Sequence, residues 1–194
     1  MKKIGLLGGS FDPPHKGHLF ISLEAKKLLK LDEVWWIVTP QNPLKILKPA
    51  TYQERVSNCK NITRNYPINI KEIEKKIGSN YSYKTINYIL HHYKNIKFFW
   101  LMGADNLVSF NRWQKWQKIF ENMSIVIFKR HGYNTKALKS IASKKYNHAR
   151  ILNSTVNLED FSKLPSWTII ENKEIRISST EIRNQRDKLR GKNY

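Results

Sequence analysis

Cysteine is almost missing from this chain, because Cys59 is its one example among 194 residues. A single cysteine excludes an internal disulfide and fits a reducing compartment. We expect no secretory signal, since glycines and Asp12 interrupt the apolar residues that follow Lys2 and Lys3. No stretch approaches the roughly 20 consecutive apolar residues of a membrane-spanning helix. We therefore expect a cytoplasmic protein with no disulfide and no membrane partner.

Acidic residues are also scarce. Asp and Glu total 15 against 35 Lys and Arg, which leaves a formal net charge of +20. Such a charge favours polyanionic partners, either nucleic acid or small molecules such as nucleotides. The lysines are scattered among Asn and Ile residues and form no single block, a pattern that the compositional bias of a genome also produces. We expect no specific nucleic-acid partner, and the sequence sets no oligomeric state.

The hydrophobic pattern predicts alternating strands and helices. The chain is long enough for one domain, residues 1–194, and too short for two ordinary ones. Short apolar or β-branched runs predict strands at residues 3–7, 33–39, 68–70, 97–102, 124–128 and 167–170. Helices are predicted at residues 19–31, 52–63, 83–93 and, as a basic surface helix, 136–150. This alternation indicates an α/β fold whose mostly parallel sheet carries helices on both faces.

A glycine-rich stretch joins the first predicted strand to the first predicted helix. It reads Gly8-Gly9-Ser10-Phe11-Asp12-Pro13-Pro14-His15-Lys16-Gly17-His18. Glycines after a strand let backbone N–H groups approach a phosphate, and the first turn of the next helix adds unpaired N–H groups. His15 and His18 are three residues apart and so share one face of that turn. The stretch predicts a phosphate site; a surface pair or half of a zinc site is the alternative, but the sequence clusters no further zinc ligands.

Another candidate follows the strand predicted at residues 97–102. Gly103 and Asp105 come directly after it, and ligands bind beyond the carboxyl ends of parallel strands. Asp105 could cap a helix or accept a hydrogen bond from a ribose hydroxyl. Apolar residues then recur at every third position: Leu107, Phe110, Trp113, Trp116 and Ile119. At 3.6 residues per turn these five cannot share one buried face, so at least one tryptophan should face outward or line a cavity.

A second group of hydroxyls lies near the C-terminus. Ser178, Ser179 and Thr180 precede Arg183, and residues 178–194 read as a helix with a basic tail. Hydroxyls followed by an acidic residue are typical of a helix cap. The same hydroxyls, the backbone N–H groups and the guanidinium could also hold a polyphosphate.

These segments together resemble a known family. Residues 8–18 resemble the first signature of the HxGH nucleotidylyltransferases, and the Gly-Gly and Pro-Pro-His elements are most similar to nicotinate-nucleotide adenylyltransferases. The string from Ile177 to Arg183 is similar to the second signature. The resemblance implies a Rossmann-like doubly wound fold. It also implies transfer of AMP from ATP to nicotinate mononucleotide, which gives deamido-NAD and pyrophosphate in NAD biosynthesis, with Mg²⁺ bound to the nucleotide.

The resemblance further implies roles for individual residues. The catalytic residues would be His15 and His18. The residues that bind the ATP phosphates would be Gly8, Gly9, Ser10, Phe11, Ser178, Ser179, Thr180 and Arg183. The residues that bind nicotinate mononucleotide would be Lys45, Ser82, Thr85, Gly103, Asp105 and Trp113, with Trp113 stacked on the pyridine ring. Ser82 could instead act as a helix cap.

Two alternative functions stay open at this point. Another HxGH-type enzyme would use nicotinamide mononucleotide or phosphopantetheine as its acceptor. A non-catalytic nucleotide-binding or RNA-binding module could use the same scaffold.

Overall fold

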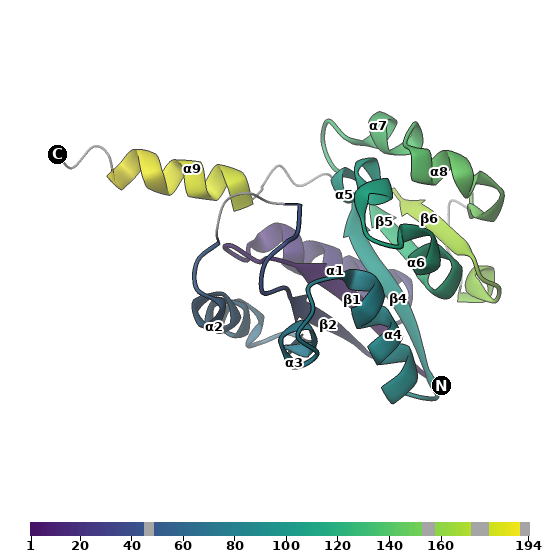
Figure 1. The fold of residues 1–194 in the computed structure, drawn as a ribbon, viewed down its shortest axis with the longest axis horizontal. Helices are drawn as coiled ribbons and strands as arrows, with labels where there is room; N and C mark the ends of the chain where they lie inside the picture. Colours follow the sequence, from purple (N-terminus) through teal and green to yellow (C-terminus); the bar gives the residue numbers. More distant parts are fainter. Residues whose placement is uncertain (45–48, 153–157, 172–178, 191–194) are drawn as a thin grey trace.

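The computed structural model describes residues 1–44, 49–152, 158–171 and 179–190, with backbone only at residue 158 and at residues 185–190. Lys45 and Ser178 therefore lie outside the described residues. Within them, six strands form one parallel sheet in the order β3-β2-β1-β4-β5-β6 (Figure 1). The strands are β1 (Lys2–Gly9), β2 (Glu33–Val38), β3 (Ile68–Lys71), β4 (Ile96–Gly103), β5 (Ser124–Phe128) and β6 (Ser166–Ile170).

Helices and short 3₁₀ turns connect the strands, and α9 extends away from the sheet (Figure 1). The α-helices are α1 (Lys16–Leu28), α2 (Tyr52–Thr63), α3 (Ile73–Lys76), α4 (Ser82–His92), α5 (Ala104–Val108), α6 (Trp116–Asn122), α7 (Asn134–Leu138), α8 (Ile141–Lys145) and α9 (Ser179–Arg190). The 3₁₀ turns are η1 (Phe110–Arg112), η2 (Asn147–Ala149) and η3 (Leu158–Phe161). Helix α2 has the predicted bounds, because the Thr51 side chain caps it by accepting a hydrogen bond from the Glu54 N–H at 3.3 Å.

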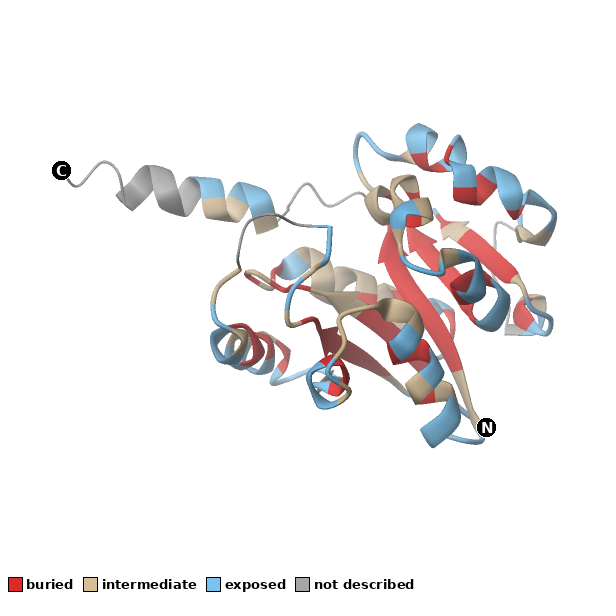
Figure 2. Cartoon of the chain, viewed as in Figure 1, coloured by how far each residue is buried: buried red, intermediate tan, exposed pale blue. Residues whose placement is uncertain are grey.

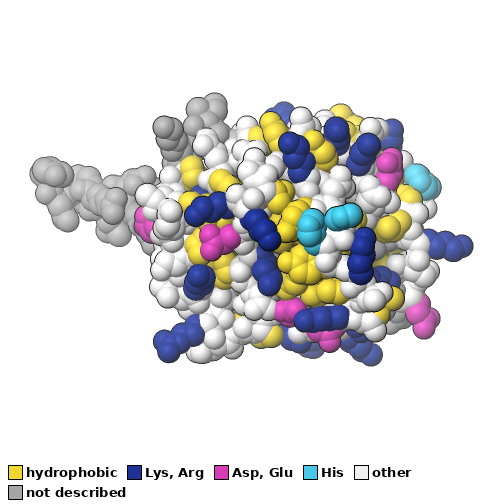
Figure 3. Space-filling model, turned by 60° about the horizontal axis from the view of Figure 1, so that its bottom comes forward, with side chains coloured by type: hydrophobic (Ala, Val, Ile, Leu, Met, Phe, Trp, Pro, Cys, Tyr) yellow, Lys and Arg dark blue, Asp and Glu magenta, His cyan; other side chains and the backbone are white. Residues whose placement is uncertain are grey.

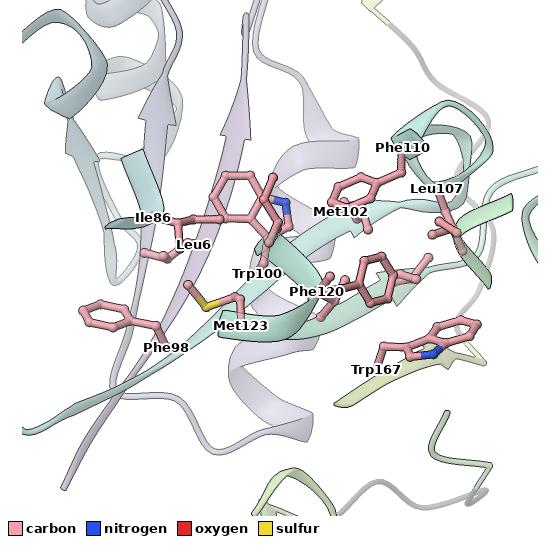
Figure 4. Close-up of a cluster of buried hydrophobic side chains, with 14 of the residues drawn as sticks. Leu6, Ile86, Phe98, Trp100, Met102, Leu107, Phe110, Phe120, Met123 and Trp167 are labelled. Carbon is pink, nitrogen blue, oxygen red and sulfur yellow. The ribbon is translucent and has the colours of Figure 1, made fainter. Parts of the chain in front are cut away.

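The sheet is buried on both faces, as Figure 2 shows for its central strands. Alternate residues of β4 belong to opposite hydrophobic clusters, with Trp100 in one and Phe99 in the other. The cluster around Trp100, shown in Figure 4, packs against α4, α6 and α8. The cluster around Phe99 packs against α1 and α2. Strands buried on both faces are continuous hydrophobic runs, and the expected α/β fold with helices on both faces is confirmed.

The strand order creates a crevice at one edge of the sheet. From β1 the chain winds through β2 to β3 and then returns to β4 on the other side of β1. The connections that leave β1 and β4 therefore diverge at their carboxyl ends, where open α/β sheets bind ligands. Gly8 pairs with Ile37 and Gly103 with Phe128. The glycines that end β1 and the turn that follows β4 consequently lie at the same edge.

The segment at residues 136–150 differs from the prediction. It is not one basic surface helix, since α7, α8 and η2 follow one another with breaks between them. Ala137, Ala142 and Tyr146 are buried against the core. Through these few apolar residues the three short elements pack against the core one after another, and the surrounding lysines stay exposed.

The segment at residues 105–120 is broken as well. Helix α5 and η1 end before Trp113, and α6 begins after Lys115, whose φ of 52° lies in the left-handed region. Because of this break, Trp113 and Trp116 are only partly buried at the edge of the core. The prediction that the three-residue spacing would leave a tryptophan outside the core is confirmed, and the break is the reason.

Basic side chains are spread over the surface. Figure 3 shows one face on which Lys and Arg side chains stand singly among hydrophobic and other groups. Across the four described ranges, no helix combines the length and the apolar character that crossing a membrane requires.

Candidate active site

A cavity of about 460 Å³ opens at the carboxyl edge of the sheet. Its walls come from the turn after β1, the ends of β2, β4 and β5, and the first turns of α4 and α9. The sequence-predicted residues that line it are Gly8, Gly9, Ser10, Phe11, His15, His18, Ser82, Gly103, Asp105, Trp113, Ser179 and Thr180. Segments distant in the sequence therefore share one cavity.

His15 and His18 cap α1 reciprocally. The backbone N–H of Gly17 donates to Nδ1 of His15 at 3.1 Å, and the backbone N–H of His15 donates to Nδ1 of His18 at 3.2 Å. A nitrogen that accepts a hydrogen bond carries no proton, so the proton of each neutral ring lies on Nε2. The ring centroids are 3.9 Å apart. The backbone thus fixes two neighbouring N–H donors at the start of a helix.

Electrostatics favours the neutral form of His15. Its side chain is nearly buried, with 8% exposed. Burial, with a smaller contribution from the nearby Arg130 and against an opposing effect of Glu181, lowers the pKa of His15 from 6.5 to about 4. At neutral pH, His15 therefore offers a hydrogen-bond donor and no positive charge.

The turn after β1 is held by close packing. A Cβ at Gly8 would lie 3.0 Å from the Trp100 ring, so glycine at residue 8 lets the ring pack closely against the strand without a shift. Phe11 adopts a left-handed φ of 48° and stacks on Trp36 with ring centroids 4.6 Å apart. Ser10 is buried beside it and lines the cavity. This packing holds the residues of the turn at the cavity wall.

The first turn of α9 lies against the same turn. The Ser179 hydroxyl donates to the Pro13 carbonyl at 3.0 Å. Arg183 donates to the Asp12 carbonyl, lies 3.6 Å from the Asp12 carboxylate, and donates to the Thr180 hydroxyl at 3.1 Å. The two motifs, more than 160 residues apart, are therefore in contact. Arg183 does not line the cavity, whereas Ser179 and Thr180 do.

Trp113 forms an aromatic part of the cavity wall. Its ring meets Trp100 edge to face at a centroid distance of 6.4 Å and lies 4.8 Å from Phe110. These contacts fix one side of the indole, and the partly exposed ring lines the cavity. A rigid aromatic surface of this kind suits a flat heterocycle.

The two hydroxyls at the start of α4 have different surroundings. Ser82 lines the cavity. Thr85 is fully buried, and its hydroxyl lies within hydrogen-bond distance of the Glu74 carboxylate, at 3.2 Å, and of the Tyr81 carbonyl, at 3.4 Å. The structure therefore places Ser82 at the cavity wall and Thr85 behind it.

Gly103 and Asp105 form a compact turn after β4. A Cβ at Gly103 would lie 2.5 Å from the Asp105 carboxylate, so a larger residue here would displace that carboxylate from its observed position. Arg130 donates to Asp105 Oδ2 at 2.8 Å. Asp105 Oδ1 is buried and, among the described residues, has no hydrogen-bond partner. The ion pair holds the carboxylate at the cavity wall, where its oxygens could accept from a sugar hydroxyl.

Sequence reasoning missed four charged residues that line the cavity: Glu74, Arg112, Lys129 and Arg130. Lys129 and Arg130 directly follow β5, and their place after a buried strand was the available signal. Lys129 also pairs with Glu171. Glu74 lies in the four-residue helix α3, which gave no sequence signal, and only 3% of it is exposed. Burial raises the pKa of Glu74, while hydrogen bonds from Thr39 and Thr85 oppose the rise.

The chemistry of the phosphate end suits anions. It offers imidazole N–H groups, hydroxyls and backbone N–H groups, which donate to phosphate oxygens. In the part of the chain that the structure describes, no three His, Cys, Asp or Glu side chains cluster closely enough to hold a metal ion.

Comparisons with known proteins agree with this geometry. The cytidylyltransferase-like family model matches residues 6–185. A probable nicotinate-nucleotide adenylyltransferase of Cereibacter sphaeroides is 38% identical over 180 residues, which cover 93% of this chain and 95% of that protein. One from Agrobacterium fabrum is 37% identical over 93% of this chain and 97% of its own length.

Solved structures share the fold. The nicotinic acid mononucleotide adenylyltransferase of Plasmodium falciparum complexed with NaAD has a TM-score of 0.69 and 19% identity, covering 95% of this chain and 83% of that one. A putative nicotinate-nucleotide adenylyltransferase from Vibrio parahaemolyticus has a TM-score of 0.59 and 19% identity. The match covers 95% of this chain and 86% of that one. The Rossmann-like fold and the resemblance found in the motifs are confirmed. The chain belongs to the nicotinate-nucleotide adenylyltransferase family of nucleotidyltransferases.

Proposed function

We propose that this enzyme transfers AMP from ATP to the 5′-phosphate of nicotinate mononucleotide, giving deamido-NAD and pyrophosphate in NAD biosynthesis. The observation that carries the proposal is one cavity that joins a phosphate site at His15 and His18 to an aromatic wall at Trp113. The names of the relatives support the reaction. Residues 1–194 would act as a single cytoplasmic domain, with residues 178–194 as its phosphate-clamp helix and basic tail.

The reaction needs positioning more than proton transfer. The acceptor phosphate is already an anion, so neither a general base nor a covalent intermediate is required. A phosphate oxygen attacks the α-phosphorus in line, and pyrophosphate leaves from the opposite side. Catalysis then depends on alignment and on stabilising the charge that develops on the phosphate oxygens.

We assign the α- and β-phosphate oxygens to the first motif. Nε2–H of His15 and of His18 would donate to them, together with backbone N–H groups at Gly8 and Gly9. Their donors are already oriented by the caps of α1, so little reorganisation accompanies the reaction. Ser10 and Phe11 line the same wall.

We assign the departing β- and γ-phosphates to the second motif. Ser179, Thr180 and Arg183 lie within the first turns of α9, where hydroxyls, a guanidinium and a helix N-terminus all favour anions. Ser178 would join them.

The acceptor would occupy the other end of the cavity. Its pyridine ring would stack on Trp113, while Ser82, the Gly103 turn and Asp105 would contact the rest of the mononucleotide. Thr85 would act from behind the wall by holding Glu74, and Lys45 would contribute from the loop after β2.

Mg²⁺ would arrive with ATP. The donor groups of the phosphate end suit phosphate oxygens, whereas Mg²⁺ prefers carboxylate, carbonyl and water oxygens. The nucleotide's own phosphates would therefore hold the ion, which would offset their negative charge.

Pyrophosphate release tests the proposal directly. The enzyme is incubated with ATP and Mg²⁺, and nicotinate mononucleotide, nicotinamide mononucleotide and phosphopantetheine are compared as acceptors. We expect release with nicotinate mononucleotide, at a rate well above that with the other two. Equal or faster release with nicotinamide mononucleotide or phosphopantetheine would mean that nicotinate mononucleotide is not the preferred acceptor. No release with any of the three would favour a nucleotide-binding module without catalytic activity.

A further inference from the structure

Arg55 is a cation buried beside the cavity. It lies in the first turn of α2, and only 1% of it is exposed. Its guanidinium forms no ion pair with a carboxylate of the described residues, and it donates to four backbone carbonyls instead. Nε donates to Ala50 at 3.0 Å, Nη1 to Ser10 at 2.6 Å and to Thr39 at 2.8 Å, and Nη2 to Pro40 at 2.6 Å.

These carbonyls belong to three separate segments. Ser10 lies in the turn after β1, Thr39 and Pro40 follow β2, and Ala50 precedes α2. Pro40 and Ala50 are the two ends of the loop formed by residues 41–49. One guanidinium therefore binds both ends of this loop and joins them to the phosphate-binding turn.

Two backbone contacts strengthen the same junction. The Ala50 N–H donates to the Asp12 carboxylate at 3.3 Å. The Thr39 N–H donates to the Gly9 carbonyl at 2.9 Å. The base of loop 41–49 is thus tied to the β1 turn by Arg55 and by these two bonds.

The segments that Arg55 joins, the turn after β1 and the loop at residues 41–49, both line the cavity. Ser10 lines the phosphate side, and Asn42 and Pro43 line the side nearer α4. The loop also reaches α4 through Asn80, whose side chain donates to the Gln41 carbonyl at 2.9 Å. A shift at the base of the loop would therefore change the distance between the two walls.

Arginine is the residue type that can make this junction. Desolvation lowers the pKa of Arg55, with a smaller opposing effect from Asp12, and a buried cation costs stability unless its donors are well paired. The planar guanidinium spreads five N–H donors around a fork, whereas lysine presents three from a single nitrogen. Lysine could not reach four carbonyls that surround the guanidinium.

We propose that Arg55 is a positioning residue, which fixes the base of loop 41–49 against Ser10 and so sets the acceptor's place relative to the α-phosphorus of ATP. This inference rests on the proposed function. Arg55 touches neither substrate; its effect passes through the two walls. Small misplacements of reacting groups cost large factors in rate.

The test compares Arg55→Lys with the control Arg64→Lys, a substitution at the exposed end of the same helix. For Arg55→Lys we expect kcat to fall at least about tenfold. The dissociation constant of ATP, measured by calorimetry, should change less than about threefold, and hydrogen exchange should accelerate in peptides spanning residues 40–50. The control should match the wild type in all three measurements.

Several outcomes would overturn the inference. These are a folded Arg55→Lys with wild-type kcat, a loss explained by weaker ATP binding alone, and unchanged exchange in the loop. Arg55→Gln is measured alongside, because it places no unpaired charge in the buried site; if neither variant folds, Arg55 has a purely structural role. If the wild type releases no pyrophosphate with any acceptor, the proposed function fails, and the exchange measurement still decides whether Arg55 holds the loop.

Discussion

The two ends of the cavity are built in different ways. At the phosphate end, residues 8–18 supply the glycines, both histidines and the helix start, and His15 and His18 hold each other through caps of α1. At the acceptor end, Ser82, Asp105 and Trp113 come from different elements, and Arg130 holds Asp105 from beyond β5. The first end is local in sequence, whereas tertiary packing assembles the second.

This difference predicts how each end responds to mutation. Donors fixed by a local cap act on the charge that develops during reaction, so their loss should lower kcat. An aromatic wall binds the acceptor equally well before and during reaction, so its loss should raise KM. The comparison would fail if changes at both ends affected the same kinetic constant.

The largest effect should follow removal of a phosphate donor. We expect His18→Ala to lower kcat by about two orders of magnitude or more, because it removes an oriented Nε2–H donor. Thermal unfolding should change little, and steady-state kinetics with circular dichroism check both. His148→Ala, at an exposed histidine, serves as the control. A His18→Ala enzyme with near wild-type kcat would contradict the assignment.

A smaller effect should follow loss of the aromatic wall. We expect Trp113→Ala to raise the KM of nicotinate mononucleotide about tenfold, since stacking and buried area are both lost, while the KM of ATP stays constant. Trp116→Ala is the matched control: Trp116 packs edge to face on Phe120 and Tyr146, so its loss should lower the melting temperature only. Equal changes in the KM of nicotinate mononucleotide for the two variants would contradict the proposal that Trp113 stacks on the pyridine ring.

The same contrast explains what could be predicted from the sequence. The strand, glycine turn and helix at residues 2–28 follow one another along the chain, so local rules predicted that His15 and His18 lie together at the start of a helix. In the structure His15 is the N-cap of α1 and His18 lies in its first turn. The alternation of strands and helices predicted the parallel sheet, whereas the order of its strands came only from the structure. The second motif could be placed because hydroxyls and a guanidinium in one turn indicate an anion site.

Contacts between distant segments were harder to predict. Nothing local distinguishes Glu74 from the other acidic residues, because its burial depends on Thr85 eleven positions later. Arg55 sits in a correctly predicted helix, but its four acceptors lie in three other segments. At residues 136–150 the run of basic residues suggested one surface helix, whereas the structure has α7, α8 and η2 with Ala137, Ala142 and Tyr146 buried against the core.

A third test compares the two ends by their response to pH. The pKa of His15 is lowered to about 4 in the folded enzyme from 6.5, so the unfolded chain binds more protons between these values and stability falls as pH falls. His15→Asn keeps a capping acceptor and lacks the titrating ring. From about pH 7 to about pH 5.5, urea unfolding should show the wild type losing about 1 kcal/mol more than the variant. Parallel pH profiles would contradict the neutral state of His15.

The smallest effect should come from Glu74, with the opposite sign. Its pKa is raised above 4.5 mainly by burial, so the folded enzyme binds the proton more tightly, and stability is lost as pH rises through the folded-state pKa. Glu74→Gln does not ionise, so its free energy of unfolding should decline less from about pH 5 to about pH 8. The difference stays small because the Thr39 and Thr85 hydroxyls support the carboxylate. A variant that loses more stability than the wild type over this range would mean that burial does not dominate at the acceptor end.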